Sequence, residues 1–93
     1  MPFYTYMLRC ADDTYYTGWT THLEKRLLVH NQGKGAKYTR SRLPVTLAAS
    51  WAFESETEAR RFEYAVKQLK RRQKMALIEN SIVISLIKVN GIF

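Results

Sequence analysis

The sequence predicts a small domain of the α+β class, in which a sheet and several helices share one core. Three observations support this. Residues 3–20 are rich in aromatic residues and threonine, which favour strands. Two patterns that mark helix starts follow them. A chain of 93 residues with 46% hydrophobic residues is long enough for one packed core, so we expect a single domain.

A β-hairpin is predicted at the start of the chain. Its strands are the two segments richest in aromatic residues, 3–10 and 15–20. The residues between them, 11–14, have turn chemistry. Because side chains alternate along a strand, Tyr4 and Tyr6 share one face, whereas Tyr15 and Tyr16 point in opposite directions. One tyrosine from each strand can therefore converge on a common site.

The first helix is predicted directly after the hairpin. Thr21 and Glu24 have the Thr-x-x-Glu spacing of a capping box, in which both side chains bond free backbone N–H groups at a helix start. We expect the helix to end near Asn31 or Gln32, because Gly33 tolerates the left-handed conformation of a C-terminal cap.

Two polar residues of this helix are predicted to face the sheet. Arg26 and His30 are four residues apart, so they lie on the same helical face. Both border the apolar stripe formed by Leu23 and Leu27. A guanidinium directed at a packed surface needs hydrogen-bond partners. For His30, a hydrogen-bonded core histidine and a residue of a functional site both remain open.

A basic loop, a third strand and a second helix are predicted next. Residues 34–43 are basic and contain few aliphatic residues, and a strand can follow Pro44 over residues 45–53. Ser55 and Glu58 repeat the capping-box spacing, which predicts a second helix start. The apolar residues that follow repeat at helical spacing: Ala59, Phe62, Val66 and Leu69.

The C-terminal part is predicted in two pieces. Residues 71–78 continue or restart the helix, whereas residues 81–93 are rich in Ile and Val, which favour strands. We therefore predict a domain over residues 1–80 and an apolar tail over residues 81–93. This tail either adds an edge strand to the sheet or is a loosely held end.

The charge of the chain favours nucleic acid as a partner. Fifteen Lys and Arg against eight Asp and Glu give a formal net charge of +7. Two stretches without an intervening acid hold much of this excess: Lys34, Lys37, Arg40 and Arg42, and then Lys67, Lys70, Arg71, Arg72 and Lys74. They predict a surface that binds phosphates, with the solvated faces of a loop and a helix as the alternative.

The single cysteine, Cys10, excludes an intrachain disulfide and favours a cytoplasmic setting. It lacks the paired Cys or His spacing of a zinc site, so we interpret it as a small core residue. The N-terminus lacks the basic start and apolar run of a signal peptide, and we expect no membrane role.

Glu63 is the candidate carboxylate. Hydrolysis of a phosphodiester needs a base for the attacking water, a cation at the phosphoryl oxygens and usually a metal held by a carboxylate. Glu63 lies on the second predicted helix at the edge of its apolar stripe. Lys67, four residues later, can form a surface ion pair with it. A metal ligand and a surface pair both remain open.

The arrangement as a whole resembles the GIY-YIG nuclease superfamily over residues 3–78. Tyr4-Thr5-Tyr6 keeps the final tyrosine of the Gly-Ile-Tyr motif, and Tyr16-Thr17-Gly18 keeps the tyrosine and glycine of Tyr-Ile-Gly. Three polar residues follow in the order of the family: Arg26, His30 and Glu63. Residues 33–40 are especially similar to those of the small single-domain bacterial members.

This resemblance implies a three-stranded antiparallel sheet flanked by about three helices, and metal-dependent endonuclease activity on DNA. The implied catalytic residues are Tyr6, Tyr16, Arg26, His30 and Glu63. In that scheme a motif tyrosine takes the proton from water, and Glu63 holds one divalent cation, Mg²⁺ or Mn²⁺. Arg26 steadies the phosphoryl charge, and His30 hydrogen-bonds within the site. Nucleic-acid contacts are expected from Lys34, Lys37, Arg40, Arg42, Lys67, Lys70 and Arg71.

Two other functions remain open. A non-catalytic module with the same fold would hold DNA or RNA by its charge alone. Many active relatives carry an asparagine beyond the glutamate, in the interval that here holds residues 75–78, and Asn80 is the nearest candidate. A protein-interaction module would instead use the apolar tail over residues 81–93. A protein partner that supplies targeting is compatible with a domain of this size.

Overall fold

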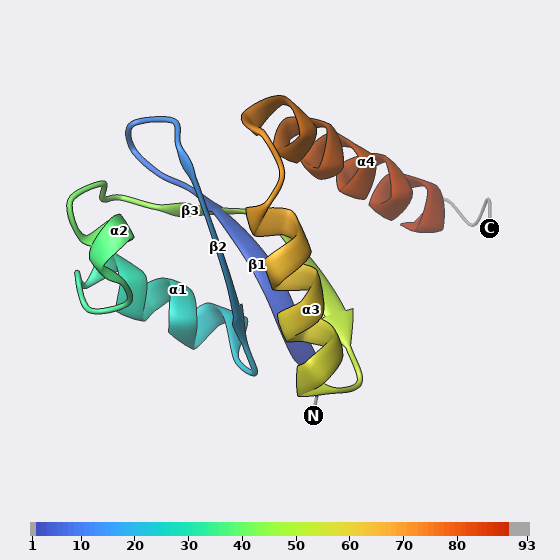
Figure 1. Ribbon diagram of the computed structural model, residues 1–93, viewed down its shortest axis with the longest axis horizontal. Helices are drawn as coiled ribbons and strands as arrows, with labels where there is room; N and C mark the ends of the chain where they lie inside the picture. Colours follow the sequence, from blue (N-terminus) through green and yellow to red (C-terminus); the bar gives the residue numbers. More distant parts are fainter. Residues whose placement is uncertain (1, 90–93) are drawn as a thin grey trace.

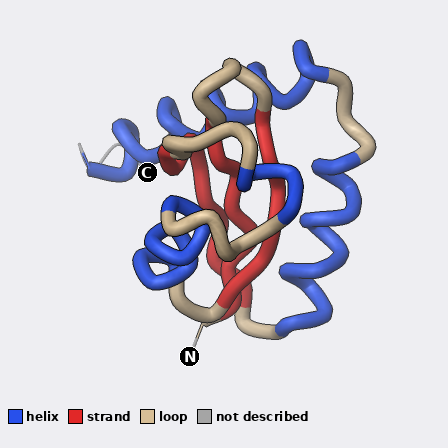
Figure 2. The backbone as a smooth tube through the Cα atoms, turned by 90° about the vertical axis from the view of Figure 1, so that its left-hand side faces the viewer, coloured by secondary structure: helices blue, strands red, loops and turns tan. Residues whose placement is uncertain are grey.

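The computed structural model describes residues 2–89, and the side chains of residues 2–80. Its centre is a three-stranded antiparallel sheet of β1 (Phe3–Arg9), β2 (Tyr15–Thr20) and β3 (Thr46–Phe53). The strand order is β2-β1-β3, so β1 pairs with both neighbours. Figure 2 shows the strands side by side, with helices around them. The predicted α+β class, the antiparallel sheet and the hairpin are confirmed.

Helices lie on both sides of this sheet. In the described residues they are α1 (Leu23–Asn31), α2 (Lys37–Arg40), α3 (Glu56–Lys67) and α4 (Arg71–Val89). Figure 1 shows α1 and α3 on opposite sides. Alternation along β1 explains this arrangement, because neighbouring side chains bond different helices. Thr5 Oγ1 donates to the Ala59 carbonyl of α3 at 2.6 Å, whereas Tyr6 faces α1.

Strand β1 supplies much of the core. Met7, Leu8 and Cys10 are at most 3% exposed, which confirms Cys10 as a core residue. On the α1 side of the sheet, the buried cluster and the apolar side chains packed around it comprise Tyr6, Leu8, Cys10, Val45, Tyr16, Leu23, Leu27 and Leu43. Burial of each large apolar side chain contributes about 1.5–3 kcal/mol, so this cluster holds α1 and the start of β3 against the sheet.

The two predicted capping boxes have different outcomes. Ser55 caps α3 as predicted, since its Oγ accepts from the Glu58 N–H at 3.2 Å. The prediction for Thr21 is wrong, because the N-cap of α1 is His22. His22 has the extended backbone of an N-cap, and its Nδ1 accepts from the Lys25 N–H at 3.4 Å. An imidazole nitrogen thus replaces the expected hydroxyl.

The end of α1 follows the predicted glycine. Gly33 has a φ of 77°, which is the left-handed conformation. Its N–H donates to the His30 carbonyl at 2.9 Å, and the Lys34 N–H donates to the Val29 carbonyl at 3.1 Å. This pair of bonds is a Schellman motif. It reverses the chain, so that the residues after Gly33 return alongside α1.

Two predicted segments differ in the structure. The basic segment 34–43 was expected to be a loop, yet it contains the single turn α2. The expected edge strand over residues 81–93 is wrong for residues 81–89, which continue α4, and residues 90–93 lie outside the described part. Once a helix has formed over residues 71–80, each further turn is easily added, because only the first turn is costly to form. Ile and Val lower helix stability by only about 0.5 kcal/mol per residue relative to Ala.

No helix in the described chain has the length and apolar character to cross a bilayer.

Candidate active site

Tyr6, Arg26 and His30 form one hydrogen-bonded cluster. Tyr6 Oη lies 2.9 Å from His30 Nε2, and Arg26 Nε donates to Tyr6 Oη at 3.3 Å. Arg26 Nη2 also donates to the Gly35 carbonyl at 2.8 Å. Tyr6 and His30 are 2% and 0% exposed, so their polar atoms depend on these bonds rather than on bulk water. Arg26 therefore has the partners that a guanidinium facing the sheet requires.

Gly18 makes room for the Tyr6 side chain. It is the register partner of Tyr6 across the β1–β2 ladder. A Cβ atom at position 18 would lie 2.5 Å from Tyr6 Oη, which is closer than van der Waals contact allows. The missing side chain therefore lets the Tyr6 ring lie over β2. The glycine that the second motif retains thus has a steric role in the cluster.

Tyr16 adds a second aromatic ring to the cluster. Its centroid lies 5.2 Å from the His30 ring and 6.5 Å from the Tyr6 ring. Tyr38 stacks on Tyr16 with a centroid distance of 6.0 Å, and the Arg42 guanidinium lies 4.0 Å from the Tyr38 ring centroid. Tyr16 is half-buried whereas Tyr6 is buried, so Tyr16 is the motif tyrosine that solvent reaches more easily.

Burial controls the protonation of Tyr6 and His30. Burial raises the pKa of Tyr6 above its ordinary value, the hydrogen bond and charge of Arg26 oppose that rise, and the charges of Tyr16 and Glu63 add to it. Burial, with the charge of Arg26 as the second cause, lowers the pKa of His30 to about 4. His30 is therefore neutral at pH 7 and carries a proton on one ring nitrogen.

Glu63 lies on α3, separate from the hydrogen-bonded cluster. Its side chain is 18% exposed, and its Oε2 lies 3.5 Å from Lys67 Nζ, so the ion pair considered from the sequence is present. Within residues 2–80, no hydrogen bond joins Glu63 to Tyr6, Arg26 or His30. Its negative charge nevertheless acts on Tyr6, whose pKa it helps to raise.

Glu63 is the residue at this site that can hold a divalent cation. Within residues 2–80, no three His, Cys, Asp or Glu side chains are grouped as a metal site. Mg²⁺ often binds one or two carboxylates, with waters and substrate phosphate oxygens in the remaining positions. The Glu63 carboxylate, which is partly exposed, fits that donor set.

Two residues of the site were missed from the sequence. Thr39 is 0% exposed, and its Oγ1 lies 2.9 Å from His30 Nδ1. A Cβ atom on Gly35 would lie 2.4 Å from the same nitrogen, so only a glycine packs directly on the imidazole there. A buried histidine needs a hydrogen-bond partner for each ring nitrogen, which is a sequence signal for a residue such as Thr39. That signal does not identify which hydroxyl group is the partner.

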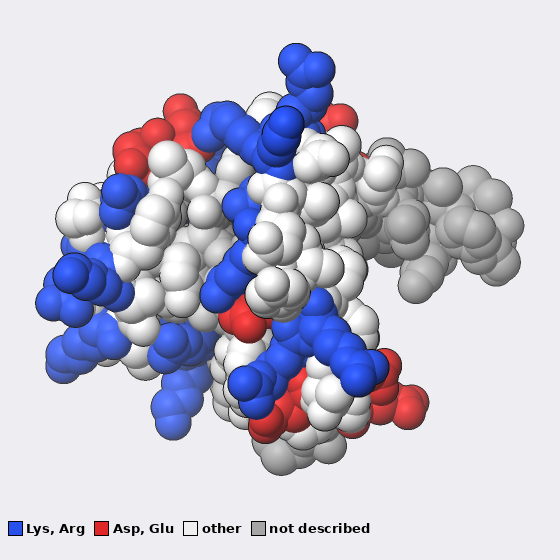
Figure 3. Space-filling model, viewed as in Figure 1, with Lys and Arg blue, Asp and Glu red and all other residues white. Residues whose placement is uncertain are grey.

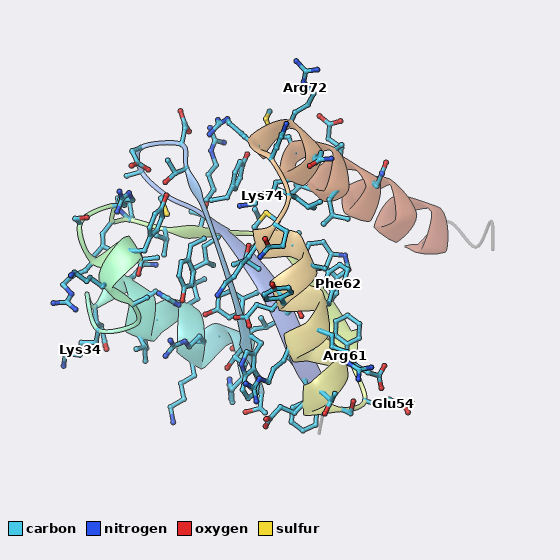
Figure 4. The ribbon with its side chains drawn as sticks, viewed as in Figure 1. Lys34, Glu54, Arg61, Phe62, Arg72 and Lys74 are labelled. Atoms are coloured by element: carbon cyan, nitrogen blue, oxygen red, sulfur yellow. The ribbon has the colours of Figure 1, made fainter. Side chains whose placement is uncertain are left out.

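Some of the predicted nucleic-acid-binding residues are exposed. Lys34, Lys37, Arg40 and Lys70 belong to this group. Figure 4 shows Lys34 on the α1 side of the molecule and Arg72 projecting at the start of α4. In Figure 3, Lys and Arg atoms gather in both of these regions, and a patch of acidic atoms lies near the β1–β2 turn. These predicted binding residues therefore lie in two regions of the surface, although other exposed cations also lie on α3.

Other predicted binding residues have partners within the chain. Arg42 Nε lies 3.0 Å from Asp12 Oδ2. Arg71 donates to the Asp13 carbonyl, and its guanidinium lies 5.5 Å from the Tyr15 ring centroid. Both arginines are thereby attached to the β1–β2 hairpin, and a phosphate would have to compete with these contacts.

A family match covers most of the chain. A family model described as the GIY-YIG catalytic domain matches residues 2–76. The chain therefore belongs to the GIY-YIG family, which confirms the resemblance stated from its motifs.

Two relatives of similar size are about half identical in sequence to this chain. The UPF0213 protein BH0048 of Halalkalibacterium halodurans is 53% identical over 78 residues, which cover 84% of this chain and 83% of that protein. The UPF0213 protein VNG_2274C of Halobacterium salinarum is 54% identical over 74 residues, which cover 80% of this chain and 96% of that protein.

Two solution NMR structures are also similar. That of the UPF0213 protein BH0048 from Bacillus halodurans has 52% identity and a TM-score of 0.56, and the match covers 85% of this chain and 84% of that one. That of EF2693 from E. faecalis has 41% identity and a TM-score of 0.60, with 86% and 85% covered. The chain is thus similar to small proteins over most of their length.

Proposed function

We propose that this chain is a metal-dependent endonuclease domain that hydrolyses phosphodiester bonds in DNA. Membership of the GIY-YIG family supports a nuclease-like fold and an interaction with nucleic acid. The observation that carries the proposal is the cluster of Tyr6, Arg26 and His30, in which a guanidinium is held beside a tyrosine hydroxyl by hydrogen bonds.

Arg26 is suited to a phosphoryl group. Two of its five N–H donors bond Tyr6 and the Gly35 carbonyl. The other donors can bond phosphoryl oxygens, whose geometry a planar guanidinium matches. Because Arg26 is held in place before substrate binds, it stabilises charge that develops in the transition state with little reorganisation.

The remaining roles follow from exposure and charge. In this proposal Tyr16, the more exposed motif tyrosine, accepts the proton of the attacking water, and Glu63 holds one Mg²⁺ or Mn²⁺. When bound, such a cation supplies a Lewis acid for the phosphoryl oxygens. Tyr6 and His30 are buried and act by holding Arg26 in position.

A non-catalytic module that binds nucleic acid is the second candidate. One observation favours it: Lys67 Nζ lies 3.5 Å from Glu63 Oε2, and an ammonium there competes with a divalent cation for the carboxylate. In that function, the exposed Lys and Arg side chains bind the phosphate backbone, and Glu63 only forms the ion pair with Lys67.

A cleavage screen distinguishes the two functions. The full chain is incubated with single-stranded, duplex, flapped and branched DNA, and with matching RNA, in the presence of Mg²⁺, Mn²⁺ or a chelator. We expect metal-dependent cleavage of at least one DNA substrate. Salt-sensitive binding without cleavage of any substrate would support the binding module, and the absence of both would exclude the two functions.

The double variant Lys37→Ala/Arg40→Ala is expected to bind DNA more weakly and with a flatter dependence on salt. Both residues are exposed on α2, the turn that also carries Thr39 of the site. Each phosphate contact contributes about 0.9 to the slope of log affinity against log salt on duplex DNA, so the slope should fall by about 2 if both residues make contact. Fluorescence anisotropy across a salt series measures this slope.

Lys25→Ala/Arg61→Ala is the matched control, because it removes the same charge from two exposed residues on α1 and α3. A surface centred on α2 predicts a clearly smaller change for this control. Equal slopes in the two double variants would show that only net charge matters, and would remove α2 as the specific contact.

A further inference from the structure

The helical turn α2 presents two different surfaces. Lys37, Tyr38 and Arg40 are exposed, whereas Thr39 between them is 0% exposed. Its hydroxyl points at His30, with Oγ1 lying 2.9 Å from Nδ1. A threonine among exposed basic residues is thus fixed in the interior by a polar contact.

The second hydrogen-bond partner of the Thr39 hydroxyl indicates whether Thr39 donates to His30 or accepts from it. Thr39 Oγ1 donates to the Ala36 carbonyl at 3.2 Å, and a carbonyl can only accept. A threonine hydroxyl has one proton, so a Thr39 that donates to Ala36 must accept from His30. This places the His30 proton on Nδ1 and leaves Nε2 as an acceptor.

The rest of the cluster is consistent with that proton position. With Nε2 unprotonated, the Tyr6 hydroxyl donates to it across 2.9 Å, and the Tyr6 oxygen accepts from Arg26 Nε. With the proton on Nε2, both His30 and Arg26 would donate to the Tyr6 oxygen. The Tyr6 proton would then lack an acceptor in a buried place, which is costly, whereas the Ala36 carbonyl would keep the Arg40 N–H from which it accepts at 3.1 Å.

We propose that Thr39 is a positioning residue that keeps the His30 proton on Nδ1, so that Tyr6 donates to His30 and accepts from Arg26. The guanidinium is thereby held from one side by Tyr6 and from the other by the Gly35 carbonyl. The effect of Thr39 on cleavage rests on the proposed function, whereas the position of the His30 proton does not.

Nitrogen NMR of the imidazole rings tests the proton position directly, because protonated and unprotonated ring nitrogens have distinct chemical shifts. The chain has two histidines, and the second is the exposed N-cap His22. The background variant His22→Asn removes its signal and keeps a side chain suited to an N-cap. We expect Nδ1 to be the protonated nitrogen of His30 at pH 7.

Thr39→Val should change that result, because valine has nearly the same shape and lacks the hydroxyl. The loss of one hydrogen bond should move the tautomer ratio towards Nε2–H by about 10-fold. Thr39→Ser keeps the hydroxyl and should retain Nδ1–H. If Thr39→Val does not fold, the wild-type and Thr39→Ser spectra still test the proposal, since Nε2–H in either of them would overturn it.

Single-turnover cleavage provides the second measurement. Thr39→Val should lower the rate at saturating DNA by about 10- to 100-fold with little change in affinity, and Thr39→Ser should restore most of it. Protonation of Nε2 in the wild-type protein, or an unchanged tautomer in Thr39→Val, would overturn the proposal. A shifted tautomer with a normal rate would overturn its catalytic part. If the wild type cleaves nothing, the endonuclease proposal fails, and the spectra still decide the role of Thr39.

Discussion

Glu63→Gln is expected to lower metal-dependent cleavage by at least about 10²-fold, since a metal held at the phosphoryl group contributes several kcal/mol to the transition state. The amide keeps the size and helix propensity of the side chain and removes the charge that a cation requires. Only the ion pair with Lys67 is lost, and a partly exposed pair contributes at most about 1 kcal/mol, so the fold and the DNA affinity should be retained. Cleavage rates across a Mg²⁺ titration, with thermal unfolding alongside, measure both effects.

Glu24→Gln and Glu79→Gln are the matched controls, because both carboxylates are exposed, on α1 and α4 respectively. They make the same change of charge and should cleave like the wild type. Equally fast cleavage by Glu63→Gln at limiting Mg²⁺ would show that this carboxylate does not hold the metal.

Arg26→Ala is expected to reduce the single-turnover cleavage rate by roughly 10² to 10³, with a much smaller loss of affinity. A cation fixed at developing phosphoryl charge stabilises the transition state more than bound substrate, and removal of one such donor typically has this effect. The variant also leaves the Tyr6 oxygen and the Gly35 carbonyl without their partner. Its unfolding midpoint must therefore be measured with its rate and its dissociation constant.

Arg26→Lys separates charge from geometry, because an ammonium keeps the charge and cannot bond Tyr6 and Gly35 as a planar fork. It should remain slow. Arg60→Ala is the control for charge, since Arg60 is an exposed arginine of α3 that pairs with Glu56 at 3.4 Å. If Arg26→Ala lowers the DNA affinity by roughly 10² to 10³ and cleaves at the normal rate at saturating DNA, Arg26 is a binding residue only.

Local patterns in the sequence predicted most of the fold and part of the site. The four-residue spacing of Arg26 and His30, and their position beside the apolar stripe of α1, predicted that the helix directs both side chains at the sheet. The hydrogen bonds to Tyr6 agree with that orientation. The glycine after α1 and the serine before α3 ended and began helices as predicted, because such signals act within one turn.

Contacts between distant segments were not predictable in this way. Thr39 and Gly35 enter the site because the chain reverses after α1 and packs on His30, and no periodic pattern encodes that contact. The strand preference of residues 81–89 was outweighed by their attachment to a helix that had already formed. Arg42 and Arg71 appeared as free charges in the sequence, whereas the structure places both against the hairpin turn.

The separation of Glu63 from the cluster affects how chains of this fold can diverge. The hydrogen bonds among Tyr6, Arg26, His30 and Thr39 all lie within residues 6–39, whereas the charge of Glu63 only helps to raise the pKa of Tyr6. A substitution at position 63 leaves each of those bonds in place. Under the proposed function, a descendant of this chain can therefore lose or regain cleavage by one mutation while it still folds and holds nucleic acid. Natural selection can then act on strand cleavage and on binding independently.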